Sequence, residues 1–118
     1  DPAKKSKAQV GIADALRLAG SSGEAVPIYR KVLEADPSNF EAMGGLGLCL
    51  LNEGEIQGKL ELSQEGLNLM EKFTEMAPDS HPLKADVKIA VNYLKTEKKL
   101  VPQKMTTPKT TPAKGKKP

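Results

Sequence analysis

The sequence contains no Trp, only two Phe and two Tyr, one Cys and one His among 118 residues. Because aromatic residues are so few, a hydrophobic core has to be built from Leu, Ala, Val, Ile and Met, a composition that favours helices. No stretch alternates apolar and polar residues at period two, which argues against a β-sandwich or barrel. Cys49 alone cannot form an internal disulfide, and with His81 as the only histidine a Cys/His zinc site lacks ligands. We therefore expect no disulfide, metal or other cofactor.

Long apolar runs are missing as well, so no transmembrane segment is expected. The chain is long enough for one domain at most, which excludes a large multidomain enzyme. Catalysis has no support, because His81 has no matched Ser or Cys partner and Cys49 lies in an apolar run typical of a core. Gly44, Gly45 and Gly47 lack the Lys-Ser/Thr of a phosphate loop. The sequence thus predicts a protein that is not an enzyme.

The net charge of +3 conceals a division along the chain. Residues 8–94 carry 7 basic and 13 acidic residues, a net charge of −6, whereas residues 95–118 carry +7. An acidic body with a basic tail argues against a nucleic-acid-binding domain, which needs positive charge on a structured face.

The two ends of the chain are expected to lie outside the folded domain. Residues 100–118 contain four prolines and almost no large apolar residues, so they cannot bury enough surface to become ordered. We predict a disordered tail there and a flexible N-terminus at residues 1–5. The chain begins with Asp1 rather than Met, which leaves open a cytoplasmic protein or an exported one whose leader has been removed.

Between the ends, the pattern predicts helices at residues 6–19, 21–36, 40–52, 55–77 and 81–99, with apolar residues at spacings of three and four. Gly20 ends the first helix and Gly54 the third. Ser21 and Glu24 have the spacing of a capping box. Pro27 lies just beyond the first turn of its helix and is expected to cost one hydrogen bond or a small kink.

The second of these helices carries a specific motif, EAVPIYRKVLEADPSN. It has a small residue at Ala25, an aromatic residue one turn on at Tyr29, and Pro37 after the end of the helix. This pattern resembles the tetratricopeptide repeat family, in which the small residue lies where the two helices of a repeat cross. Leu46-Gly47 and Gly54 recur at the expected 34-residue offset, so the chain is similar to two repeats.

The second repeat departs from the first in length. Gly54 to Pro78 is 24 residues, whereas Gly20 to Pro37 is 17, so we expect its second helix to be seven residues longer. Seven residues come within about 20° of two whole turns, so the buried stripe keeps its direction. Counting back from Pro78 places Gly66 at the crossing position and Met70 at the Tyr29 equivalent.

The resemblance implies an all-α fold, a right-handed superhelix of about five antiparallel helices spanning residues 6–99. It consists of a repeat at 6–39, a repeat at 40–79 and a capping helix at 81–99.

In this family the first helices of successive repeats line a concave groove that holds a peptide or a helix of a partner. Carried over by position, the groove here is lined by Val10, Asp14, Arg17, Gly44, Gly45, Leu48, Leu51, Asn52, Ile89, Asn92 and Tyr93. The subgroup that binds the acidic C-terminal motif of a chaperone needs Lys and Asn pairs at these groove positions. This sequence has Val10, Asp14 and Gly45 at those positions instead, so we do not expect it to bind a chaperone tail. Alternatively, Gly44 and Gly45 simply allow close helix packing and Leu48 belongs to the core.

These observations lead to two hypotheses. The first is a non-catalytic adaptor or scaffold that binds a peptide or amphipathic helix of a protein partner in the groove. The second is an oligomeric structural module, a homodimer through the long helix 55–77, whose basic tail binds nucleic acid, an anionic lipid surface or an acidic polymer.

Overall fold

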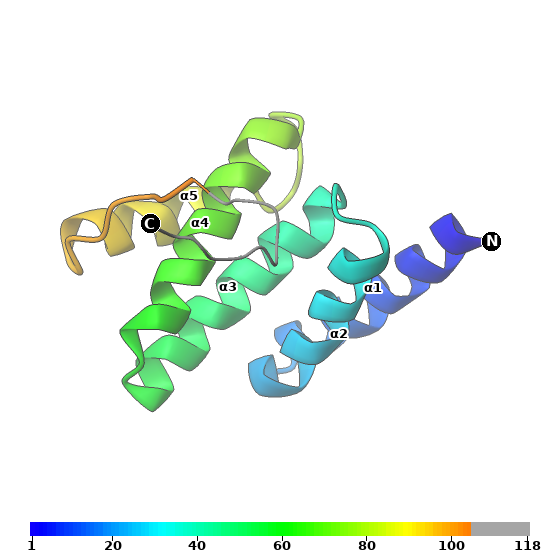
Figure 1. The fold of residues 1–118 in the computed structure, drawn as a ribbon, viewed down its shortest axis with the longest axis horizontal. Helices are drawn as coiled ribbons and strands as arrows, with labels where there is room; N and C mark the ends of the chain where they lie inside the picture. The colour runs from blue at the N-terminus through cyan, green and yellow to red at the C-terminus, as the bar shows by residue number, and fades with distance from the viewer. Residues whose placement is uncertain (105–118) are drawn as a thin grey trace, which may run out of the picture.

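The computed structural model describes residues 1–104 and shows five α-helices without a strand in that range, as the all-α prediction requires (Figure 1). The helices are α1 (Pro2–Leu18), α2 (Ser22–Ala35), α3 (Phe40–Gln57), α4 (Leu60–Met76) and α5 (Lys84–Thr96). None of them is both long and apolar enough to cross a membrane.

The helices form two antiparallel pairs followed by a single helix (Figure 1). α1 packs on α2 and α3 on α4, while α2 packs on α3 and α4 on α5. The first helices also contact one another, α1 with α3 and α3 with α5. α3 is therefore the central helix, and it supplies more buried residues than any other described helix. Tyr29 from α2 and Phe73 from α4 are the largest fully buried side chains around it.

α1 and α3 end in the same way. Gly20 has a φ of +87°, and the N–H of Ser21 donates to the Leu16 carbonyl five residues back. Gly58 has a φ of +67°, and the N–H of Lys59 donates to the Gly54 carbonyl. Both are left-handed helix ends that favour glycine. The counterpart of Gly20 is therefore Gly58, and the predicted end of the third helix at residues 52–54 is wrong.

Gly54 instead lies within the α3–α4 packing. A Cβ there would overlap the Ser63 hydroxyl and lie 3.0 Å from the Ser63 nitrogen. The glycine lets α4 approach α3 closely, so the helix continues past it. Of the seven additional residues, four lengthen α3 and three lengthen α4. The turn at Gly58 and Lys59 divides the predicted helix 55–77 between α3 and α4, so that single long helix is wrong. Ile56 and Leu60, on either side of the turn, have 69% and 55% of their surface exposed.

The N-terminus is helical rather than flexible, which corrects the prediction for residues 1–5. The Asp1 carboxylate accepts a hydrogen bond from the Ala3 N–H at 3.0 Å, and Pro2 occupies the first helical position, which needs no N–H partner. Ser21 makes no side-chain capping bond, so the predicted capping box does not form. Pro27 lies inside an uninterrupted α2, as expected.

The C-terminal boundary also differs from the prediction. α5 runs from Lys84 to Thr96, shorter than 81–99. Residues 100–103 then turn back along α4. The Gln64 amide donates to the Val101 carbonyl at 2.9 Å, and the Gln103 N–H donates to Asn68 Oδ1 at 2.8 Å. The start of the predicted tail is thus bonded to α4. The remaining tail, residues 105–118, lies outside the described residues.

Candidate functional site

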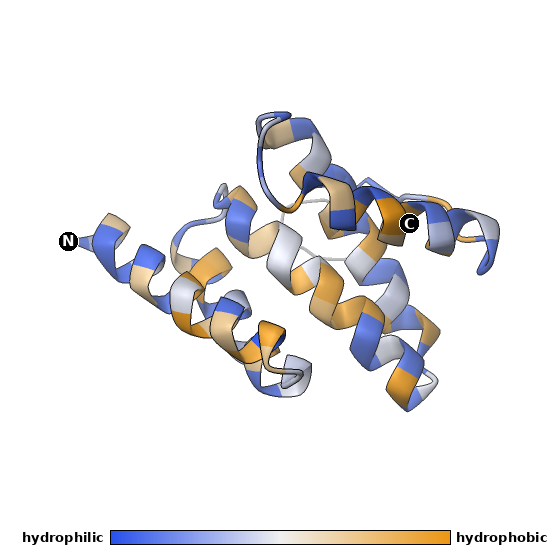
Figure 2. Ribbon diagram, turned by 180° about the vertical axis from the view of Figure 1, so that it is seen from behind, coloured by the Kyte–Doolittle hydropathy of each residue, from blue (hydrophilic) through white to orange (hydrophobic). Residues whose placement is uncertain are grey.

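The predicted site residues lie on α1, α3 and α5, and we call the surface that these helices share the first-helix face. α3 contacts α1 on one side and α5 on the other. The repeat offset places Asp14, Leu48 and Ile89 at equivalent positions of the three helices. Seen from behind, apolar residues run along the central helix α3 (Figure 2).

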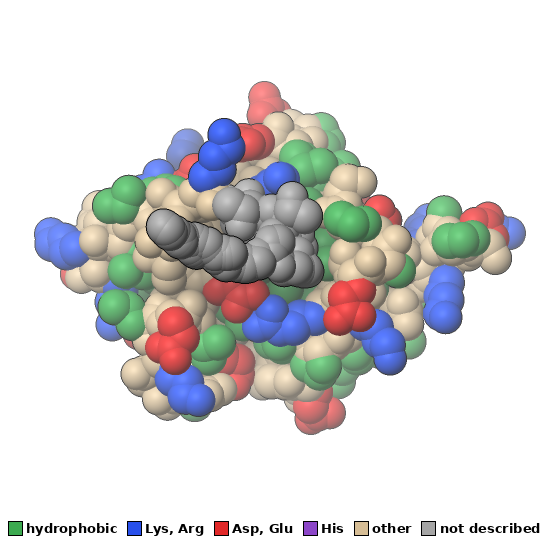
Figure 3. Space-filling view, in the orientation of Figure 1, with side chains coloured by type: hydrophobic (Ala, Val, Ile, Leu, Met, Phe, Trp, Pro, Cys, Tyr) green, Lys and Arg blue, Asp and Glu red, His purple; other side chains and the backbone are tan. Residues whose placement is uncertain are grey.

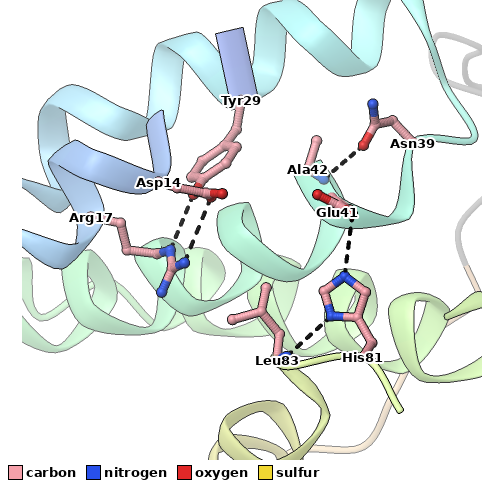
Figure 4. A network of polar contacts seen from close by, with 8 residues as sticks. All are labelled: Asp14, Arg17, Tyr29, Asn39, Glu41, Ala42, His81 and Leu83. Carbon is pink, nitrogen blue, oxygen red and sulfur yellow. Dashed lines mark hydrogen bonds and ion pairs between the residues drawn. The ribbon is translucent and has the colours of Figure 1, made fainter. Parts of the chain in front are cut away.

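On α1, Asp14 and Arg17 are already engaged by a buried tyrosine. Tyr29 is fully buried; its hydroxyl donates to Asp14 Oδ1 and accepts from Arg17 Nε at 3.1 Å (Figure 4). Arg17 Nη2 also lies 3.6 Å from Asp14 Oδ1. Burial, reinforced by the bond to Asp14, raises the pKa of the Tyr29 phenol, so the hydroxyl stays protonated. The three side chains form one satisfied network that joins α1 to α2.

The glycines of α3 serve close packing rather than forming an open floor. A Cβ at Gly45 would overlap the Tyr29 ring, 2.7 Å from Cε1. A Cβ at Gly44 would lie 2.9 Å from Phe73 Cδ1. Val10 is also in the core, with only 5% of its surface exposed. Val10, Gly44 and Gly45 are therefore covered by the protein itself, and their predicted role as groove lining is wrong.

His81 ties the turn before α5 to α3. Its Nδ1 accepts the Leu83 N–H at 3.1 Å, and its Nε2 lies 3.5 Å from Glu41 Oε2 (Figure 4). The imidazole stands edge-on to Phe73, with ring centroids 5.1 Å apart. Sequence reasoning found no partner for His81, because Glu41 and Phe73 are brought to it only by the packing of α3 and α4.

The rest of the predicted site remains accessible to different degrees. Leu48 and Leu51 are half-buried against the core, whereas Ile89 has 70% of its surface exposed and Asn92 is exposed. Asn52 is used in helix packing, since its amide donates to the Ser22 hydroxyl at 3.1 Å.

Tyr93 joins α5 to the end of α3. Its hydroxyl donates to Glu55 Oε1 at 2.9 Å, and Lys98 Nζ lies 3.3 Å from Glu55 Oε2. The hydrogen bond to Glu55 raises the pKa of the Tyr93 phenol. Because Tyr93 follows Ile89 by one turn, the bond to Glu55 turns this side of α5 towards α3. The predicted site residues on α3 and α5 that remain exposed or half-buried are Leu48, Leu51, Asn52, Ile89, Asn92 and Tyr93, and they form the accessible part of the first-helix face.

Other parts of the surface have a different character. On the face shown in Figure 3, acidic and basic side chains are interspersed. Arg30 of α2 and Glu65 of α4 form a two-pronged ion pair, with contacts of 2.6 and 3.0 Å, and the bond to Glu65 raises the pKa of the guanidinium. A shallow pocket lies between the start of α1 and the end of α2, lined by Pro2, Ser6 and Ala35. It is separate from the first-helix face.

The groups with catalytic or ligand chemistry are few. Cys49 is fully buried, and burial raises the pKa of its thiol to about 11. Within residues 1–104, no three His, Cys, Asp or Glu side chains gather closely enough to hold a metal ion. Comparison of the chain with protein-family models, with curated proteins and with solved structures finds no match.

Proposed function

We propose that the chain is a tetratricopeptide-repeat-like adaptor that binds an amphipathic peptide or helix of a protein partner through the first-helix face, without catalysing a reaction. The observation that carries this proposal is Ile89, a large apolar side chain with 70% of its surface exposed, at the position equivalent to half-buried Leu48. Covering a side chain of this size yields about 2 kcal/mol. Tyr93, one turn on, adds an aromatic edge of the kind enriched in binding sites.

The packing of both helix pairs supports the repeat interpretation. Ala25 is fully buried at the predicted crossing of α1 and α2. In the second pair a Cβ at Gly66 would lie 2.8 Å from the Gly47 carbonyl oxygen, and one at Gly47 would overlap Met70. Gly66 thus marks the close approach of α3 and α4, with Met70 one turn on, as the register predicts. The α1–α3 and α3–α5 contacts arrange the first helices side by side.

The charge of the body indicates the chemistry of the partner. Residues 8–94 have a net charge of −6, and the Glu41 side chain on α3 is 54% exposed. A complementary segment therefore carries apolar residues at helical or extended spacing together with Lys or Arg. Apolar contacts of this kind lose little affinity when salt is raised, whereas contacts made by charge alone weaken.

The test is a selection of peptides on the immobilised full chain from a displayed library, followed by affinity measurements at low and high salt. The variant is Ile89→Asp, and the matched control is Ile56→Asp, which changes an isoleucine of similar exposure, 69%, near the end of α3. We expect Ile89→Asp to weaken binding at least about tenfold and Ile56→Asp to leave it unchanged. Equal effects of the two variants would refute the proposal.

The same measurements address the alternative function of the basic tail. If affinity collapses at high salt and is lost on removal of residues 105–118, while Ile89→Asp has no effect, binding belongs to the lysines and the first-helix face has no role in it.

A further inference from the structure

α1 has a second apolar face, directed away from the rest of the molecule. Six small or apolar residues on it are exposed, and we call this set the outer face of α1: Ala8, Gly11, Ile12, Ala15, Leu18 and Ala19. Ile12 and Leu18 have 57% and 77% of their surface exposed. An amphipathic helix on the surface of a domain normally places polar residues on this side.

The repeat supplies a direct comparison, because each of these residues has an α3 counterpart 34 positions later. The counterparts of Ala8, Ile12 and Ala15 are Ala42, Leu46 and Cys49, with 0%, 2% and 0% of their surface exposed. The same face that is buried on α3 is thus open on α1.

The contacts of the remaining counterparts identify what covers the face on α3, namely α2. Gly45, the counterpart of Gly11, lies against the Tyr29 ring. Asn52, the counterpart of Leu18, bonds to Ser22 of α2. A Cβ at Gly23 of α2 would meet the Glu53 carboxylate at 3.4 Å. At Gly11, by contrast, a Cβ would have nothing within 4 Å.

From this comparison, we propose that the outer face of α1 docks an amphipathic helix of a protein partner, running antiparallel to α1 as α2 runs to α3, with an aromatic side chain over Gly11. The positive charge at the start of α1 determines which charge the C-terminal turn of the partner helix should carry. The first turns of α1 carry exposed Lys4, Lys5 and Lys7, so the C-terminal turn of the partner helix is acidic, as α2 is at Glu34.

A second copy of the chain fits this face less well. The α2 surface that would match it is already covered by α3, and the corresponding surface of α4 is packed on α5. On the exposed side of α5, one large apolar residue, Ile89, lies among Lys88, Asn92 and Lys95, and the two lysines do not complement Lys4, Lys5 and Lys7 of α1. The occupant that fits better is a helix from another protein, and a second copy is an outcome of the test below.

The test uses α2 itself as the probe. A fluorescent peptide with the sequence of residues 21–36 is titrated into the full chain, with a hydrocarbon staple between positions 27 and 31, which are exposed in α2. The staple is needed because an isolated helix of this length is marginal in water. We expect binding that is weakened at least about tenfold by Ile12→Asp in the protein and by Tyr29→Ala in the peptide. Ile56→Asp serves as the control that leaves binding unchanged.

A second measurement does not depend on the helicity of a peptide. An extended chain carries an additional copy of residues 6–39 directly before Ser6, so that the added α2 is connected to α1 as α2 is to α3. Ile12→Asp in the original repeat is then expected to lower the melting temperature of the extended chain more than that of the normal chain.

Equal shifts in the two chains, together with no peptide binding, would overturn the proposal. Sedimentation showing a dimer that Ile12→Asp dissociates and the peptide does not would also overturn it, in favour of a second copy. Because Ile12 and Ile89 lie on α1 and α5, this result is independent of the test of the first-helix face.

Discussion

Gly11 and Gly45 stand 34 residues apart at the same position of α1 and α3, yet their surroundings are opposite. At Gly45 a Cβ would overlap the Tyr29 ring, which Asp14 and Arg17 hold in place. At Gly11 a Cβ would enter open space. The sequence places both glycines in helices, but only the position of Tyr29 distinguishes a glycine required by packing from one that is not.

The two positions therefore give a matched pair of alanine substitutions. Gly45→Ala is expected to destabilise the fold by about 1–3 kcal/mol, because the tyrosine has to move in a closely packed core. Gly11→Ala is expected to stabilise it by about 0.5–1 kcal/mol, since alanine loses less backbone entropy in a helix. Urea unfolding followed by circular dichroism measures both. Changes of the same sign would mean that Tyr29 does not rest on Gly45.

Cys49 gives a prediction about reactivity and pH. Burial raises the pKa of its thiol from 9.0 to about 11, so at pH 8 only about one thiol in a thousand is ionised in the folded chain. A thiol reagent is expected to react only as fast as the chain unfolds. Because the pKa is raised on folding, the contribution of Cys49 to stability is intact below about pH 9 and is lost as the pH rises towards 11.

The measurement is the labelling rate at pH 8 in buffer and in urea, compared with the unfolding rate obtained by stopped flow. Labelling in buffer that is faster than unfolding would show that Cys49 is accessible in the folded state. If folding does not raise the pKa of this thiol, Cys49 contributes no pH dependence to the free energy of unfolding between pH 9 and 11.

At the scale of helices, the sequence predicts the number, order and pairing of the elements, because apolar spacing and turn residues are local signals. The α3–α4 boundary was misplaced for a physical reason. Gly54 and Gly58 are both plausible helix ends, and the 34-residue offset favours Gly54. Whether a glycine ends a helix or lets another helix approach depends on a distant residue, here Ser63, which the local sequence does not reveal.

The candidate site was predictable to the same extent. The register places Leu48 and Ile89 at equivalent positions of α3 and α5, and the bond from Tyr93 to Glu55 joins these helices. That these residues form one binding surface stays a prediction. Whether the other predicted site residues are accessible depends on side chains of α2 and α4. Tyr29 is hydrogen-bonded to Asp14 and Arg17, and Phe73 covers Gly44. The outer face of α1 was missed because apolar residues at spacings of three and four predict a helix without showing which of its sides is covered, although a comparison of residues 8–19 with 42–53 would have suggested it.

At the scale of the whole molecule, the helices differ in how many neighbours hold them. α3 packs against α1, α2, α4 and α5. Among the helices of residues 1–104, α5 packs only against α4 and α3, through a single face formed by Val87, Ala90 and Leu94. In a repeat architecture each unit is stabilised by its nearest neighbours, so the ends open at a lower free energy than the centre.

Native-state hydrogen exchange followed by NMR measures this gradient. Amides of α3 are expected to exchange only by global unfolding, and those of α5 by a local opening that leaves α1 to α4 folded. Leu94→Ala, which removes a fully buried side chain of α5, is expected to lower the free energy of that local opening by about 2–5 kcal/mol. Protection in α1 and α2 should change far less, because neither helix contacts α5. If Leu94→Ala lowers protection equally in all five helices, α5 unfolds together with the rest of the chain, and the molecule behaves as one cooperative unit rather than as stacked helices.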